Sequence, residues 1–152
     1  MTDATRARFG SLLSQTSRAW RRAVNRRLQP YGLTEATWLP LVHLSRAQTP
    51  MRQKDLAASL GLDGSSVVRL LDALQAGGLV TRREEDGDRR AKAIVLTPQG
   101  QATVQRVEQV AAQVRATALA GIPDRELQRA YDLLEGIVHK LDAEPDEQED
   151  RQ

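Results

Sequence analysis

The side chains best suited to chemistry in this chain are hydroxyls and guanidiniums in its middle third. Ser65 and Ser66 can hydrogen-bond to a phosphate or a base edge, and Arg69 can form a bidentate hydrogen bond with a guanine. Gly64, beside them, allows close approach of a backbone to a duplex. Farther along, the segment 86–90 combines arginines with carboxylates, and an arginine so braced suits a narrow minor groove. These residue types indicate contact with a duplex rather than covalent catalysis.

Residues 62–74 must form the element that presents the serines and Arg69. Their apolar positions recur at i, i+3, i+4 and i+7, a pattern typical of an amphipathic helix. Asp63 precedes the first turn and is expected to cap it. One face therefore packs on a core, and the other carries the polar side chains. The apolar face consists of Val67, Leu70, Leu71 and Leu74.

A second helix is predicted immediately upstream, over residues 51–61. Leu56, Ala57 and Leu60 share its inward face, and Gly61 provides the turn into the next helix. A helix, a tight turn and a second helix make up a helix-turn-helix.

A short hairpin is predicted after the Gly77-Gly78 stop. Residues 79–84 and 91–96 are strand-like runs, and the loop between them has its tip at residues 86–90. A charged loop tip is by itself more often a solvated surface. Directly behind a helix-turn-helix, however, this hairpin predicts the wing of a winged helix.

Taken in order, these motifs resemble the MarR family. The resemblance covers roughly residues 5–141, and the N-terminal segments 18–23 and 33–38 are similar to the SlyA-like branch. It implies a homodimeric bacterial transcription regulator with a helical dimerisation region and a winged-helix lobe. The matching motifs are Gln53 with Asp55-Leu56-Ala57, Ser66–Leu74, Gly78-Leu79-Val80, Asp88–Lys92 and Leu96–Gly100.

The resemblance also implies roles for individual residues. Ser65, Ser66 and Arg69 match the family's base and phosphate readers. Arg89 matches its minor-groove arginine and Asp88 the carboxylate that braces it, while Arg90 either contacts DNA or ties the wing to the lobe. The predicted DNA-contacting set is Gln53, Gly64, Ser65, Ser66, Val68, Arg69, Arg82, Asp88, Arg89 and Arg90.

Long amphipathic helices are predicted on both sides of the lobe. The first ends before Pro30, the next begins near Thr34, a long one begins at Thr97-Pro98, and the last follows Pro123 with an almost heptad seam. One small lobe cannot cover all these apolar stripes, so a two-fold dimer is favoured, with two recognition helices roughly 34 Å apart on a pseudo-palindromic site. The predicted dimer contacts are Phe9, Leu12, Leu13, Leu127, Tyr131, Leu134, Ile137, Val138 and Leu141.

The predicted fold class is mainly α with a small β-wing: a winged helix-turn-helix lobe plus N- and C-terminal helices that form a homodimer interface. Four regions are expected. Residues 1–32 form the N-terminal dimerisation helix, 33–97 the DNA-binding lobe, 98–142 the C-terminal dimerisation helices, and 143–152 an acidic disordered tail. Residues 141–152 hold six acids against one arginine, so the body of the chain is more basic than the formal net charge of +2 indicates.

The absence of cysteine excludes disulfides, thiolate zinc sites and thiol-based oxidant sensing. The polar N-terminus, with Asp3, Arg6 and Arg8, is unlike an export signal, and the longest apolar run is only Ala93–Leu96. A cytoplasmic location without membrane contact is therefore expected.

Two tryptophans and an arginine are candidates for an effector site. Trp20 and Trp38 are two of the five aromatic residues, and an indole wall with the guanidinium of Arg21 suits a small aromatic acid. The resemblance points the same way, because SlyA-like and other MarR proteins commonly respond to phenolic or benzoate-type compounds. The alternative is ordinary packing, since tryptophans at helical spacing usually belong to a core.

Neither a metal nor a cofactor is predicted. His43 and His139 are isolated, since neither has a second histidine or cysteine nearby, and the chain contains no nucleotide-binding, nucleophile-elbow or zinc-protease motif. An enzyme is therefore not expected. Two alternatives stay open: a winged-helix module for protein contacts without specific DNA binding, and an activator or anti-silencer of the SlyA type in place of a repressor released by a ligand.

Overall fold

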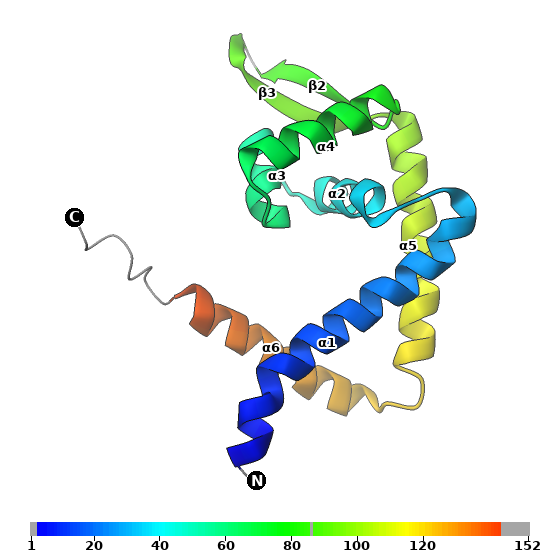
Figure 1. Cartoon of the computed structure of the whole chain (residues 1–152), viewed down its shortest axis with the longest axis vertical. Helices are drawn as coiled ribbons and strands as arrows, with labels where there is room; N and C mark the ends of the chain where they lie inside the picture. Colours follow the sequence, from blue (N-terminus) through cyan, green and yellow to red (C-terminus); the bar gives the residue numbers. More distant parts are fainter. Residues whose placement is uncertain (1–2, 86, 144–152) are drawn as a thin grey trace, which may run out of the picture. The chain divides into compact units, whose positions relative to one another are not determined.

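The computed structural model describes residues 3–85 and 87–143, without the side chains of residues 88–91. The chain divides into two compact units, residues 1–114 and 115–152. The long helix α5 runs from the first unit into the second. In chain order the elements (Figure 1) are α1 (Asp3–Leu28), η1 (Gln29–Tyr31), α2 (Glu35–Arg46), β1 (Met51–Arg52), α3 (Gln53–Leu60), α4 (Gly64–Ala76), β2 (Val80–Glu85), β3 (Asp88–Leu96), α5 (Pro98–Ala118) and α6 (Asp124–Asp142).

The helix-turn-helix consists of α3 and α4, as the sequence predicts. Gly61 ends α3 in the left-handed region at φ 64°, where glycine meets no steric penalty. Asp63 caps α4, because its side chain accepts a hydrogen bond from the amide of Ser66. The prediction of helix from residue 51 was wrong by two residues. Met51 and Arg52 instead form β1, which pairs with β3.

The sheet has the antiparallel strand order β1-β3-β2. Strand β2 pairs regularly with β3 from Val80 opposite Leu96 to Glu84 opposite Lys92, but the next pair joins Glu85 to Asp88. Residues 89–91 of β3 therefore form a bulge without partners on β2. The predicted loop tip 86–90 was too long, since β3 already begins at Asp88 and the pairing continues almost to the turn.

Two apolar clusters hold the first unit together. One joins α2, α3, α4, the sheet and the start of α5, and includes Leu41, Leu56, Val67, Leu71, Val80, Ile94 and Val104. The other joins α1, α2 and the middle of α5 through Val24, Leu28, Trp38, Val42, Val107, Val110 and Val114. Helix α2 contributes to both clusters, so it links the lobe to the long helices.

Thr97 fixes the start of α5 to the base of the hairpin. Its hydroxyl donates to the Gly78 carbonyl at 2.6 Å and accepts from the Gly100 amide at 3.0 Å, and its own amide donates to the Leu79 carbonyl at 3.1 Å. One residue thus caps α5 and anchors both ends of the hairpin.

In the second unit, α6 carries an apolar seam, and none of the residues of this helix is buried. The exposed fractions of its large side chains are 36% for Leu127, 61% for Tyr131, 39% for Leu134, 55% for Val138 and 61% for Leu141. Such a face on a helix indicates an uncovered contact surface. Within the described residues, no helix has the length and apolarity needed to cross a membrane.

Candidate nucleic-acid interface

The outer face of α4 brings together several of the predicted contact residues. Ser65, Val68 and Arg69 follow the spacing i, i+3 and i+4, which places them on one side of a helix. All three are exposed, Val68 by 38%, and Gly64 is exposed at the first helical position. Opposite them, Val67 and Leu71 are anchored in the core. The helix therefore presents small, hydroxyl and guanidinium groups from a rigid support.

Asp63 organises the first turn of α4. Its Oδ1 accepts from the Ser66 amide at 2.7 Å and from the Ser65 hydroxyl at 2.8 Å. These two donors, the amide first, hold the pKa of Asp63 below its usual range, so the cap is a carboxylate at neutral pH. Ser65 keeps its oxygen lone pairs as acceptors, while Ser66, predicted in the same set, is half-buried.

An ion pair connects α4 to β2. Arg82 donates from Nη2 to the Asp72 Oδ1 at 2.9 Å, and its side chain is 26% exposed. Asp72 lies one turn beyond Arg69 on the outer face of α4, where its charge would repel phosphates. Arg82 offsets that charge. The sequence places Arg82 among the DNA contacts; that role stays a prediction.

The wing, meaning the hairpin of β2 and β3, projects past α4 (Figure 1). The backbone of its distal part includes the bulge at residues 89–91. The predicted roles of Asp88, Arg89 and Arg90 depend on side chains that lie outside the described part of the protein.

A second ion pair, which the sequence pattern does not reveal, spans the sheet. Arg52 of β1 donates from Nε and Nη2 to the Glu85 Oε2 of β2, at 3.1 and 2.6 Å. Gln53, another predicted contact, is half-buried at the first position of α3. No local spacing signals the pair, because its members are 33 positions apart in the chain.

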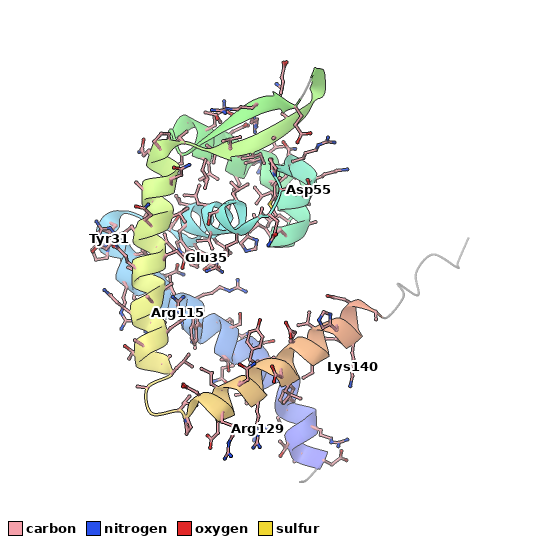
Figure 2. All side chains as sticks on the ribbon, turned by 180° about the vertical axis from the view of Figure 1, so that it is seen from behind. Tyr31, Glu35, Asp55, Arg115, Arg129 and Lys140 are labelled. Atoms are coloured by element: carbon pink, nitrogen blue, oxygen red, sulfur yellow. The ribbon has the colours of Figure 1, made fainter. Side chains whose placement is uncertain are left out.

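A chain of hydrogen bonds joins α1 to α2 around Glu35, which is labelled in Figure 2. The Trp38 indole donates to Asn25 Oδ1 at 2.7 Å, Asn25 Nδ2 donates to Glu35 Oε2 at 3.0 Å, and Arg21 pairs with Glu35 Oε1 at 3.2 Å. The pKa of Glu35 is lowered by Asn25 first and by Arg21 next, with partial burial opposing them. The guanidinium of Arg21, predicted to bind an effector, thus forms an ion pair with Glu35 instead.

A pocket of about 520 Å³ opens beside this junction and is lined by Arg22, Asn25, Arg26, Gln29, Leu33, Thr34 and Glu35. The three predicted effector contacts do not line it. Trp38 is 7% exposed and belongs to the second apolar cluster, and Trp20 packs against that cluster. Both indoles thus contribute to packing, the alternative that the sequence left open.

Comparison with known proteins decides the family. A MarR family model matches residues 31–91. A solved MarR family regulator from Rhodococcus sp. RHA1 is 30% identical, with a TM-score of 0.74, and the match covers 90% of this chain and 97% of that one. The chain belongs to the MarR family. It is thus a winged-helix transcriptional regulator and not an enzyme.

Two further structures resemble this MarR protein over nearly their whole length. The transcriptional regulator PA3341 is 44% identical with a TM-score of 0.83, and the match covers 90% of this chain and 99% of that one. CouR from Rhodococcus jostii RHA1, solved bound to p-coumaroyl-CoA, is 32% identical with a TM-score of 0.75, covering 90% of this chain and 95% of CouR. The likeness to the SlyA-like branch stays a prediction.

The two histidines of this MarR protein lie on different helices. His43 on α2 hydrogen-bonds through Nδ1 to the Ser59 hydroxyl on α3, and His139 is exposed on α6. In the part of the chain that the structure describes, no three histidine, cysteine or acidic residues cluster as metal ligands would. His43 therefore joins two helices of the lobe.

Proposed function

We propose that this MarR-family regulator binds a pseudo-palindromic operator as a homodimer and represses transcription by excluding polymerase. The observation that carries the proposal is the outer face of α4. There Ser65, Val68 and Arg69 stand exposed on a helix whose opposite side is fixed in the core. An arginine and a serine on such a face can read base edges and phosphates in a major groove. Arg89 in the wing would add a minor-groove contact.

The dimer in this proposal is formed by the terminal helices. The seam of α6 repeats at almost heptad spacing, from Leu127 through Tyr131 and Leu134 to Val138 and Leu141, and Leu12 of α1 is 58% exposed. Apolar side chains at that spacing favour packing against another helix. A homodimer brings two recognition helices onto one duplex, which raises affinity through the second, linked contact. The proposed regions are residues 1–32 and 98–142 for dimerisation and 33–97 for DNA.

Duplex DNA suits the lobe better than RNA does. Between Met51 and Leu96 the sequence contains no phenylalanine, tyrosine or tryptophan on which single-stranded bases could stack. The lobe offers hydroxyls and guanidiniums on a helix instead. This composition also disfavours a pure protein-docking module, whose contact surface is typically rich in aromatic residues.

The proposed effector is an anionic aromatic compound that releases the protein from DNA. The pocket at the junction of α1 and α2 supports this, because Arg22 and Arg26 line it and, among the described residues, neither pairs with a carboxylate. The structure of CouR with p-coumaroyl-CoA supports an aromatic acyl group joined to an anionic part. Release requires that the ligand bind the DNA-free state more tightly than the DNA-bound state.

Genomic selection tests the DNA-binding proposal. Purified protein is mixed with fragmented duplex from its own genome, and the retained fragments are sequenced and footprinted. We expect a shared inverted repeat with half-sites about 10 base pairs apart, protected on one face of the duplex. Retention without any shared sequence would contradict specific binding.

Ligand release from the selected operator tests the effector proposal. p-Coumarate and p-coumaroyl-CoA are titrated into the complex of operator with wild type or with the double variant Arg22→Ala, Arg26→Ala. We expect at least one ligand to release the wild type at lower concentration than the variant. Arg18→Ala, another exposed arginine of α1 outside the pocket lining, is the control. Equal release of wild type and double variant would contradict the proposal that the effector binds in this pocket.

A further inference from the structure

We propose that Arg52 and Glu85 form a clamp that positions the wing for DNA contact. Neither residue belongs to the predicted contact set, and the proposal rests on the DNA-binding function proposed above. Arg52 acts here as a positioning residue: it holds the distal hairpin through Glu85 and does not itself read the duplex.

The clamp closes across the whole sheet. Arg52 lies on β1 opposite Ala93 of β3, while Glu85 lies on β2 at the other edge. Ala93 of β3 lies in register between Arg52 and Arg83, and Glu85 is two residues beyond Arg83 on β2. Ala93 has only a methyl side chain and is 5% exposed, so it leaves room for the long Arg52 side chain to extend over β3 towards Glu85. The Arg52 Nε and Nη2 both reach the Glu85 Oε2, at 3.1 and 2.6 Å. A charge-assisted hydrogen bond thus joins two strands that are not neighbours in the sheet.

The clamp holds the wing at the point where the regular pairing of β2 with β3 ends. The regular ladder ends at Glu84 opposite Lys92, and the bulge at residues 89–91 follows. A bulge interrupts the ladder and lets the strand bend, so backbone pairing alone leaves the direction of the distal hairpin poorly fixed. Glu85 is the first residue beyond this break. A tether at Glu85 therefore restrains the segment that carries Arg89.

The other end of the clamp is tied to α3. The Arg52 amide donates to the Asp55 Oδ2 at 2.9 Å, which ties Arg52 to the first turn of α3; Asp55 is labelled in Figure 2. Arg52 therefore connects the helix-turn-helix, through Asp55, to the wing, through Glu85. The Arg82 pair with Asp72 fixes the hairpin nearer its base. The two pairs together set the wing relative to α4.

The direction in which Glu85→Gln changes operator affinity distinguishes the clamp from a simple effect of surface charge. Glu85 is an acid on the element that approaches DNA, so its neutralisation would tighten binding if only charge mattered. The clamp predicts the reverse for Glu85→Gln, weaker operator binding by about fivefold, the factor expected for a partly exposed ion pair. Glu84→Gln is the matched control, because Glu84 is an exposed acid on the same strand and no ion pair engages it among the described residues.

The test measures operator affinity by fluorescence anisotropy for wild type, Glu85→Gln, Glu84→Gln and the charge exchange Arg52→Glu with Glu85→Arg. We expect Glu85→Gln to weaken binding, Glu84→Gln to leave it unchanged or tighten it, and the exchange to recover most of the loss. In an Arg89→Ala background, Glu85→Gln should have no further effect, because its action passes through the wing arginine. Unchanged or tighter binding by Glu85→Gln, or a full effect in the Arg89→Ala background, would overturn the clamp.

Hydrogen exchange of the DNA-free proteins separates this proposal from the DNA-binding proposal. The amides of residues 87–92 should exchange faster in Glu85→Gln than in Glu84→Gln, while those of α4 stay unchanged. This readout holds even if wild type shows no operator preference, a result that would remove the proposed function alone. Equal exchange in the two variants would overturn the clamp.

Discussion

The indole of Trp38 on α2 donates to Asn25 Oδ1 on α1 at 2.7 Å, and this bond begins the polar connection between the two helices. Trp38 is 7% exposed, so its N–H is shielded from water and depends on Asn25 for a partner. Asn25 in turn donates to Glu35. The packing of Trp38 and the position of Glu35 are therefore coupled.

Asn25→Ala should lower the free energy of unfolding by about 1–3 kcal/mol, because it leaves the buried indole N–H unsatisfied. Urea unfolding at fixed protein concentration measures the change, with tryptophan fluorescence as the probe. Gln29→Ala removes an exposed amide from the same stretch of chain and should change stability by no more than about 0.5 kcal/mol. Equal stability of the two variants would show that the bond contributes little.

His43 should make stability depend on pH. Burial lowers the pKa of His43 from 6.5, and the positive charge of Arg46 lowers it further. The unfolded chain therefore binds a proton more readily, so the free energy of unfolding falls as the pH drops below the unfolded pKa, towards the folded one. At pH values above the unfolded pKa of 6.5, His43 is neutral in both states and no longer lowers the free energy of unfolding.

Denaturant midpoints at pH 7.5 and 5.5 check this expectation. The loss on acidification should be smaller in His43→Gln than in wild type. The chain offers His139→Gln as a control, since His139 is exposed on α6. If His43→Gln loses as much stability as wild type on acidification, His43 does not carry the effect.

Much of the fold follows from local patterns. The apolar spacing of Val67, Leu71 and Leu74 predicts α4 and its buried side, and Asp63 and Gly61 mark its boundaries. Arg52 shows where such patterns end, because a two-residue strand has no periodicity and gains its structure only from pairing with β3. Long-range pairs such as Arg52 with Glu85 depend on the three-dimensional arrangement of the strands. The exposed outer face of α4 was accessible from the sequence, whereas the ion pairs that join the hairpin to β1 and α4 were not.

Gly100→Ala should destabilise the lobe strongly. A methyl group at Gly100 would stand 2.1 Å from the Leu79 carbonyl oxygen, so the start of α5 and the base of the hairpin would have to separate. We expect a loss of about 1–3 kcal/mol or more in thermal unfolding. Gly10→Ala is the control: nothing lies within 4 Å of its added methyl, and it should gain up to about 1 kcal/mol from better helix propensity. A Gly100→Ala protein as stable as wild type would contradict the close packing.

Charging the α6 seam should prevent dimerisation. The double variant Leu134→Glu, Ile137→Lys places two charges on the proposed contact, where their desolvation opposes association. Sedimentation equilibrium should show monomers or unfolded chain, whereas Glu135→Lys, an exposed position of the same helix, should leave the dimer intact. A folded, DNA-binding dimer of the double variant would place the interface elsewhere.

An anisotropy titration of wild type and Arg69→Ala on the duplex upstream of the protein's own gene, across a salt series, tests whether α4 reads the operator. Wild type should prefer this duplex to a scrambled one, with affinity falling as salt rises. Arg69→Ala should lose about 1–3 kcal/mol on the specific duplex and much of the preference. Equal affinity of wild type for both duplexes, with no effect of Arg69→Ala, would contradict the assignment of α4 as the element that reads the operator.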